Sequence, residues 1–255
     1  MNPKTALFVG AGAVERAWDP VVAALQHFSP VVINADQASC MLTRSVFLSR
    51  FFASCTGPEG IDTSYDLLEK QKERLAEELK LAEKEGLIRA RRDIEWVVNH
   101  LLLPRSPVFY VVSTNWDHTV DYAIENILSS NAGTQTRVFH LHGSYSEPAT
   151  LYLPSEISSE PYREMVHSQE IGGMHVGLME ALNELEHLVI YGLSLDPLDA
   201  ELTQTLSTVI DSPAIKTIDI LDLNPERVAD RIVLLMKNPT LPNIKCIKPA
   251  DIQKR

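Results

Sequence analysis

The sequence predicts an α/β protein with a doubly wound, Rossmann-like and mostly parallel sheet that carries a helical insertion. Short apolar runs alternate with helical patterns along most of the chain, which is typical of βαβ units. These runs lack strict polar alternation, as expected of strands that are buried on both faces of a parallel sheet. One long segment, residues 39–104, interrupts the alternation with helical patterns alone.

Five compact apolar runs are expected to be the strands of the sheet. In chain order, they span residues 5–10, 108–113, 137–141, 187–192 and 216–222. The helical patterns between and after the later strands span residues 119–128, 176–186, 198–210 and 225–236. The last helix begins with Asn224 and Pro225, a polar cap followed by a proline that suits a first helical turn. Two short runs, 31–34 and 244–247, are further strand candidates.

The segment 39–104 is expected to be a helical insertion that packs over one end of the sheet. Residues 65–85 are dense in charge, with opposite charges at helix-pairing distances, and Gly86 ends this helix. A second amphipathic helix spans residues 93–103 and stops before Pro104. A charged helix of this kind suits either a solvated face or an oligomer contact.

A single domain, residues 1–255, is expected from the length of the chain and its hydrophobic content of 45%. Residues 1–38 and 105–236 would form the Rossmann-like core, with the insertion 39–104 between them. Residues 237–255, rich in proline and lysine, would form a C-terminal tail.

Composition disfavours several classes of function. The net charge of −11 leaves no basic excess to neutralise phosphates, so direct binding to nucleic acid or to anionic membranes is not expected. The three cysteines, Cys40, Cys55 and Cys246, form no CxxC pair, which indicates a reducing compartment and no structural zinc. No apolar stretch reaches the roughly 18–20 residues of a membrane helix, and no signal peptide precedes the first strand. We therefore expect a cytoplasmic protein.

A glycine turn, Gly10-Ala11-Gly12, follows the first predicted strand. Glycines at a strand-to-helix turn allow backbone amides to approach a phosphate, and a helix N-terminus favours its negative charge. The full dinucleotide fingerprint has a third glycine where this chain has Glu15. A tight turn after a buried strand explains the pattern equally well.

Asn115 and Asp117 follow the second predicted strand, where open α/β sheets bind ligands. An asparagine in this place can hold sugar hydroxyls or position a water molecule. Asp117 can contact the amide of a ligand, or cap the helix that is expected to begin near Thr119. The sequence leaves both roles of Asp117 open.

His140 and His142 lie on one face of the third predicted strand, because they are two residues apart. Such a pair can bind a metal ion, but no further cluster of ligands stands out in the sequence, so no metal is expected. We expect His140 to be a buried, hydrogen-bonded core residue. His142 comes just before a Gly-Ser turn, where a neutral imidazole would be placed to act as a general base.

The last two strand ends also carry polar turns. Gly192 and Ser194 follow the fourth strand, and Asp222 ends the fifth, where a carboxylate often accepts hydrogen bonds from a ribose diol. Taken one at a time, both motifs are explained as ordinary turns that end a strand.

Together, the five strand-end motifs resemble those of the SIR2 (sirtuin) family, and more specifically its bacterial SIR2-like branch. They are Gly10-Ala11-Gly12, Thr114-Asn115-Trp116-Asp117, Leu141-His142-Gly143-Ser144, Gly192-Leu193-Ser194-Leu195 and Asp222-Leu223-Asn224-Pro225. The resemblance covers residues 5–36 and 105–236, but not the insertion. It implies that NAD is the ligand.

The resemblance also implies a role for each matching residue. Three would be catalytic: Asn115 would hold the nicotinamide ribose and orient a water, Asp117 would face the carboxamide, and His142 would be the general base. The glycine turn would cradle the pyrophosphate, the Gly192 turn would line the phosphate and ribose, and Asp222 would meet the adenosine ribose. The expected nucleotide-binding residues are Gly10, Ala11, Gly12, Thr114, Asn115, Gly192, Ser194 and Asp222.

Departures from the sirtuin pattern argue against protein deacylation. The four zinc-binding cysteines of deacylases have no counterpart, and Ala13 and Val14 stand where a serine usually follows the glycine turn. Members of the family without the zinc module are typically NAD-cleaving effectors of bacterial anti-phage defence. The resemblance therefore implies an NAD+ glycohydrolase that depletes NAD in abortive infection, releasing nicotinamide and ADP-ribose without zinc.

Alternative functions are a sensor that binds NAD or ADP-ribose without cleavage, and a Rossmann dehydrogenase that uses Asp36 as the ribose acid. A deacylase is the remaining option. Effectors of this kind commonly need self-assembly or a partner, so we expect a homo-oligomer or a separately encoded sensor or partner protein.

Overall fold

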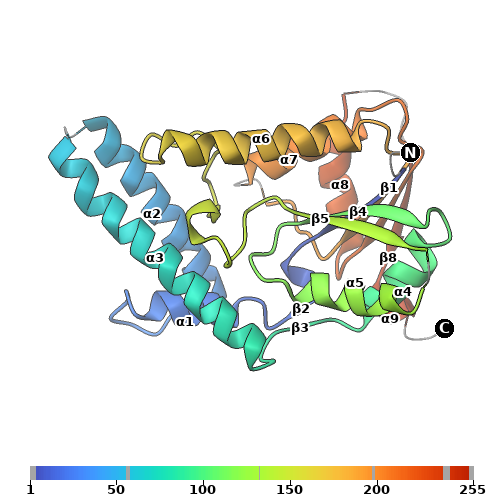
Figure 1. Ribbon diagram of the computed structural model, residues 1–255, viewed down its shortest axis with the longest axis horizontal. Coiled ribbons are helices and arrows are strands. Elements are labelled where there is room, and N and C mark those ends of the chain that lie inside the picture. The colour runs from blue at the N-terminus through green and yellow to red at the C-terminus, as the bar shows by residue number, and fades with distance from the viewer. Residues whose placement is uncertain (1–3, 56–57, 132, 197–198, 238–241, 253–255) are drawn as a thin grey trace.

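Six parallel strands form the central sheet of the structure, a computed structural model that describes residues 4–55, 58–131, 133–196, 199–237 and 242–252 (Figure 1). The strands are β1 (Thr5–Val9), β4 (Val108–Ser113), β5 (Gln135–His140), β6 (His187–Tyr191), β7 (Thr217–Leu221) and β8 (Asn243–Ile247). Every pair of neighbours is parallel. The predicted α/β fold with a parallel sheet is confirmed.

The order of the strands is that of a Rossmann fold. The sheet runs β5-β4-β1-β6-β7-β8, which is the order 3-2-1-4-5-6 when these strands are numbered along the chain. The order reverses between β1 and β6, which pair directly. In open α/β sheets, ligands bind beyond the carboxyl ends of the strands at such a switch point.

Both faces of the sheet are buried, as the continuous apolar runs predict. Along β1, Ala6 and Phe8 pack into one core with α6 (Met165–Leu182), α7 (Ala200–Ile210) and α8 (Pro225–Leu235). Leu7 and Val9 pack into a second core with α5 (Thr119–Ser129) and the π-helix Val97–Leu102, which continues α4 (Asp93–Trp96). The alternation of side chains along a strand thus supplies two apolar faces, and helices cover each of them (Figure 1).

The C-terminal segment corrects the expected boundaries of the core. Residues 237–255 were expected to be a tail, but β8 extends the sheet beyond β7 and is followed by α9 (Pro249–Ile252). The short strand candidate at 244–247 is therefore part of the core. Residues 31–34, the other short candidate, form no strand.

Two further boundaries differ from the sequence prediction. Helix α6 begins at Met165 instead of residue 176. The glycine turn leads into a 3-10 turn (Ala11–Ala13) and the short strand β2 (Val14–Glu15), so the next helix, α1 (Asp19–Gln26), starts well away from it. The glycine turn is therefore not followed directly by a long helix.

The helical insertion is confirmed as helical, and α1 belongs with it. Helices α1, α2 (Ala35–Cys55) and α3 (Pro58–Lys84) lie together beside the sheet (Figure 1). They enclose a third core, which includes Leu25, Leu42 and Leu75. The charged helix α3 therefore buries one face. The insertion returns to the sheet through β3 (Arg89–Ala90), which pairs antiparallel with β2.

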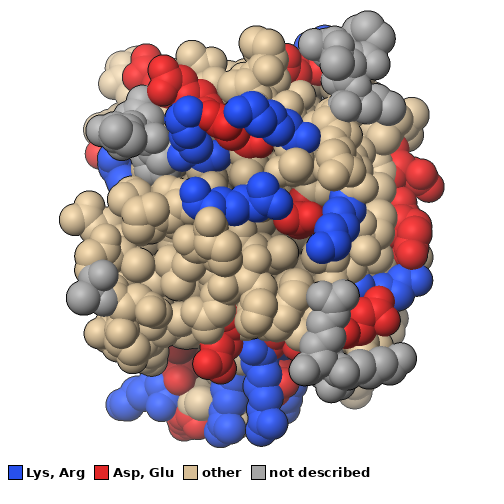
Figure 2. Space-filling model, turned by 90° about the vertical axis from the view of Figure 1, so that its right-hand side faces the viewer, with Lys and Arg blue, Asp and Glu red and all other residues tan. Residues whose placement is uncertain are grey.

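Basic and acidic side chains lie next to one another on the face shown in Figure 2, around a broad area without charged side chains. Lys4 and Lys216, for example, both pair with Glu186. This mixed pattern is unlike the basic patch that nucleic acid requires. None of the helices in the described ranges combines the length and the apolar character needed to cross a bilayer.

Candidate functional site

A cavity of about 370 Å³ lies at the switch point of the sheet. Its floor comes from the turns after β1, β4, β5, β6 and β7, and its other walls come from α1, α2, α3, the start of α7 and the loop 152–156. The predicted site residues that line it are Ala11, Gly12, Thr114, Asn115, Asp117, His142, Gly192, Ser194 and Asp222. Gly10 is the one predicted residue that does not line the cavity. Five turns that are far apart in the sequence therefore meet around one space.

The three glycines at the switch point are required by the packing of two turns against each other. A Cβ on Gly12 would lie 2.8 Å from the Cα of Gly192, and a Cβ on Gly10 would lie 2.7 Å from the Leu193 side chain. Gly192 also has a φ of +62°, and its Cβ would lie 2.3 Å from the amide nitrogen of Ala13. The glycine pattern is thus explained by close backbone packing, before any ligand is considered.

The amides of this turn are largely used by the protein itself. Gly10 donates to the carbonyl of Tyr191 (3.1 Å), Gly12 to that of Gly192 (2.8 Å), and Ala13 to that of Gly10 (2.9 Å). The turn therefore offers a phosphate fewer free amides than the glycine pattern predicts.

Asn115 is buried, and hydrogen bonds hold it at the end of β4. Its backbone amide donates to Oγ of Ser113 (3.2 Å), and its Nδ2 donates to the carbonyl of Gly10 (3.4 Å). Its own carbonyl lies 3.0 Å from Nδ1 of His140. The side chain faces the cavity in a fixed orientation, as a residue that binds a sugar or a water must.

Asp117 has the structural role that the sequence left open. Its Oδ1 accepts a hydrogen bond from the backbone amide of Thr119 (2.9 Å), the first residue of α5. The side chain also lines the cavity, although the residue is only 4% exposed. Asp117 thus holds the first turn of α5 and lines the cavity at the same time.

His142 lies just beyond β5, and acceptors face both of its ring nitrogens. Nδ1 is 3.2 Å from the carbonyl of Thr114, and Nε2 is 3.2 Å from Oδ1 of Asp199. Burial lowers the pKa of His142, but the carboxylate of Asp199 and the Thr114 carbonyl outweigh it, so the pKa lies above its ordinary value. Only an imidazolium donates to both partners. This arrangement favours the protonated form of His142, whereas a general base has to be neutral.

Asp199 lies at the site, although nothing in the sequence singled it out. It caps α7 by accepting a hydrogen bond from the amide of Leu202 (3.2 Å), and it lines the cavity opposite His142. An aspartate just before a predicted helix is usually only a cap, so the sequence carries no signal for its second contact.

Tyr152 connects the site to a second pair of a histidine and a carboxylate. Its ring lies parallel to that of His142, with centroids 5.8 Å apart, and its other neighbour is the ring of His175. Nδ1 of His175 is 2.8 Å from Oε2 of Glu201. Burial raises the pKa of Glu201, but His175 and the other donors around it more than compensate and hold it at about 2. No pattern in the sequence points to these three residues, because they come from a loop and from helices.

The cavity is acidic. Its described lining carries no lysine or arginine, and its five carboxylates are Asp117, Glu156, Asp196, Asp199 and Asp222. Two arginines hold the surrounding turns instead: Arg91 donates to the carbonyl of Gly12 (2.9 Å), and Arg231 to that of Leu195 (3.0 Å). This charge pattern suits a ligand with a cationic group more than a bare polyphosphate.

The remaining predicted residues have local partners. The carbonyl of Ser194 accepts a hydrogen bond from Arg231, and Oδ1 of Asp222 accepts one from the amide of Asn224 (2.8 Å). His140 is hydrogen-bonded, as expected, but it is only partly buried. Its second nitrogen lies beside Asp121, a neighbour that the sequence analysis did not identify.

Neither the family models nor the curated proteins compared with this chain give a match. The resemblance to SIR2-like proteins therefore remains a prediction from the motifs. Because one fold supports many activities, the function has to be argued from the residues around the cavity.

Proposed function

We propose that this chain is an NAD+ glycohydrolase that cleaves NAD to nicotinamide and ADP-ribose. The observation that carries the proposal is the convergence of Asn115, Asp117 and His142 on one cavity at the switch point of a sheet with Rossmann strand order. At about 370 Å³, this cavity falls within the usual range of ligand pockets, about 300–1,000 Å³.

The acidic lining fits the chemistry of this reaction. The nicotinamide ring of NAD is cationic and leaves as a neutral molecule, so no general acid is required. Positive charge then develops on the ribose, in a transition state like that of other glycoside cleavages. Carboxylates such as Asp117 and Asp199, fixed by their helix-capping bonds, are placed to stabilise that charge without reorganising.

Asn115 and His142 would handle the attacking water. The fixed amide of Asn115 would orient the water or the ribose hydroxyls. Once His142 has released its Nε2 proton to solvent and Nε2 has separated from Asp199, the neutral ring would accept a proton from that water. The chain has no counterpart of the zinc cysteines that accompany protein deacylation, which favours water over an acyl-lysine as the attacking group.

A sensor that binds NAD or ADP-ribose without cleaving it is the second candidate. The observation that favours it is the double engagement of His142, which leaves no free lone pair on the ring. A dehydrogenase has less support, because Asp36, its expected ribose acid, lies in the first turn of α2 and does not line the cavity.

We further propose a cytoplasmic role in anti-phage defence, in which assembly or a partner switches the enzyme on. The resemblance to SIR2-like effectors supports the role, and the free thiols of Cys40 and Cys246 fit a reducing compartment. Helix α2 exposes Phe47 and Phe51, at 54% and 57%, which gives a second copy or a partner an apolar surface to bind.

Incubation of NAD with the purified chain, followed by chromatography of the products, tests the proposed activity. Nicotinamide and ADP-ribose in equal amounts are expected, at protein concentrations that span the monomer and any oligomer. Calorimetry with NAD and with ADP-ribose separates the alternatives. Tight binding without nicotinamide release would establish the sensor instead, and reduced cofactor in the presence of an alcohol would indicate a dehydrogenase.

A further inference from the structure

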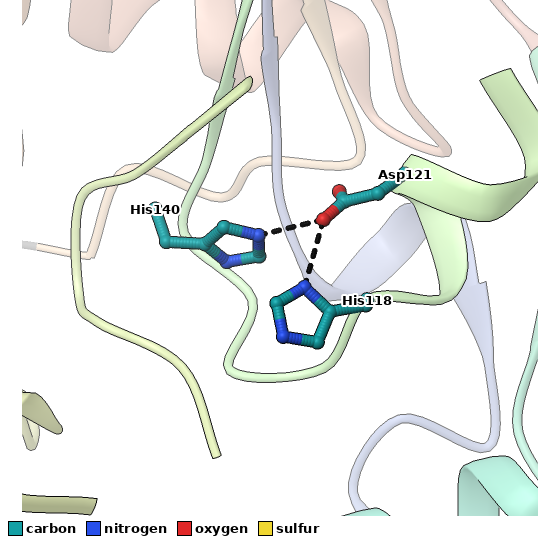
Figure 3. A group of neighbouring side chains, drawn as sticks. All are labelled: His118, Asp121 and His140. Carbon is teal, nitrogen blue, oxygen red and sulfur yellow. Dashed lines mark hydrogen bonds and ion pairs between the residues drawn. The ribbon is translucent and has the colours of Figure 1, made fainter. Parts of the chain in front are cut away.

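A cluster of two histidines and one aspartate lies next to the cavity but outside its lining (Figure 3). His118 precedes α5, Asp121 is in the first turn of α5, and His140 ends β5. Nε2 of His140 is 2.7 Å, and Nδ1 of His118 is 2.9 Å, from the same oxygen, Oδ2 of Asp121. We propose that His118, Asp121 and His140 form a binding site for a divalent transition-metal ion of the zinc class.

The spacing of the ligand atoms fits such an ion after a small adjustment. One nitrogen or oxygen from each residue lies within 4.8 Å of the others. A tetrahedral zinc ion with bonds of about 2.0–2.1 Å has ligand atoms about 3.3 Å apart. The two distances to Asp121 would lengthen by roughly half an ångström from 2.7 and 2.9 Å, which side-chain rotation can supply.

The hydrogen bonds around the cluster are of the kind that surround metal-bound histidines. A histidine that binds a metal usually donates its other N–H to a carbonyl or a carboxylate, which fixes the ring and its tautomer. His140 does this through Nδ1, which lies 3.0 Å from the carbonyl of Asn115. The outer nitrogen of His118 likewise lies 3.4 Å from Oγ of Ser146. Both rings thus direct one nitrogen outward and the other toward Asp121 (Figure 3).

Asp121 has an oxygen to spare. Oδ1 is buried and has no hydrogen-bond partner among the described residues, while Oδ2 has two histidine partners. An unpartnered buried carboxylate oxygen is costly, so Asp121 keeps an acceptor that the two histidines do not use. Two imidazoles and one carboxylate also leave the fourth position of a zinc ion open for water.

A path for the ion is present. His140 lines a separate cavity of about 290 Å³, together with Glu147 and Glu170. A hydrated cation can approach through this acidic space. Its described lining shares no residue with the cavity at the switch point, although the two meet at one turn, where His142 lines the first cavity and Gly143 the second. The site would connect α5 to β5 and would hold the carbonyl of Asn115 through His140. The inference does not depend on NAD cleavage, because it rests on the ligand geometry alone.

Titration of the full, metal-stripped chain with Zn²⁺, in competition with a chromophoric chelator, tests the site. One tight equivalent is expected, and Co²⁺ should give the absorption of a tetrahedral complex with nitrogen ligands. Asp121→Asn and His118→Ala should weaken binding of both ions at least about tenfold, since even outer-shell losses cost 10–100-fold. His100→Ala, which removes an exposed histidine elsewhere, should bind as the wild type does.

The outcomes are separable. Circular dichroism of each variant without metal shows whether it folds. If Asp121→Asn does not fold, the result for His118→Ala is decisive, because His118 lies at the rim of the cluster. Equal zinc affinity in the wild type and His118→Ala would overturn the proposal, as would binding that is lost when Cys40 and Cys246 are replaced by serine. Binding that is at least about tenfold weaker in His118→Ala, with His100→Ala and the cysteine variant unchanged, supports it.

Discussion

Oδ1 of Asp199 lies 3.2 Å from Nε2 of His142, and this contact determines which protonation state of the imidazole is stable in the cavity. The carboxylate raises the pKa of His142 against the effect of burial. His142 is therefore held as a donor until the contact is broken. The proposed reaction and its pH dependence both follow from this pair.

Replacing Asp199 with asparagine should shift the pH profile of NAD cleavage. The pKa of His142 would fall without the negative charge, so the neutral ring would persist to lower pH and the acidic limb of the rate profile would move down. Asparagine can still accept the Leu202 amide and cap α7. The rate is measured across pH in wild type and variant, with Asp230→Asn on the exposed face of α8 as control. An acidic limb that stays in place would contradict the role of Asp199.

The same pair should make stability depend on pH. Because the folded state raises the pKa of His142, the stabilising contribution is fully present below the ordinary value, about 6.5, and is lost as pH rises through the raised value. The free energy of unfolding should therefore differ more between wild type and Asp199→Asn at pH 5.5 than at pH 8.5. Urea denaturation at the two pH values measures it, and an equal difference at both would refute the linkage.

Gly192→Ala should destabilise the fold at the switch point. The residue has a φ of +62°, and a Cβ would lie 2.3 Å from the backbone nitrogen of Ala13. We expect a loss of at least about 2 kcal/mol from strain and displaced backbone. Gly173→Ala in α6 is the matched control, because nothing lies within 4 Å of its added Cβ, and it should stabilise by about 0.4–1 kcal/mol. Similar urea midpoints for the two variants would show that the turns do not pack this way.

A buried ion pair should hold the wall of the cavity. Glu156 accepts from Lys72 (2.9 Å) and Arg163 (2.9 Å), and it also binds the amide of Leu153, which lines the cavity. Lys72→Met should cost about 3 kcal/mol, the lower end for a broken buried pair, because Arg163 remains. Lys80→Met, at an exposed position of the same helix, should change the free energy of unfolding by less than about 0.5 kcal/mol. Equal losses in both variants would rule out the buried pair as the cause.

The core of the fold could be predicted from the sequence because its signal is local. Strands buried on both faces read as uninterrupted apolar runs, and β1 and β6 are of this kind. β8 was placed in a tail because its strand, Asn243–Ile247, has polar residues and is largely exposed at the sheet edge. Edge strands lack the continuous apolar pattern that identifies central ones.

Only those residues of the candidate site that lie at strand ends could be predicted from the sequence. Asn115 and His142 follow strands directly, so the parallel order of the sheet brings them together. Asp199, Tyr152 and the walls from α1 and α3 depend on how loops and helices fold back over the sheet. No spacing in the sequence encodes those contacts, and the caps formed by Asp117 and Asp199 conceal their second role.

The rate of nicotinamide release from NAD by wild type, Asn115→Ala, His142→Ala and the control His100→Ala tests the central claim most directly. We expect the wild type and the control to release nicotinamide equally, and the loss of His142 to slow release by about 10²–10⁴-fold, the usual contribution of a general base. Asn115→Ala should also slow release strongly, with each variant still folded by circular dichroism. Intact NAD in the presence of folded wild type, as monomer and as oligomer, or equal rates in all four chains, would contradict the account.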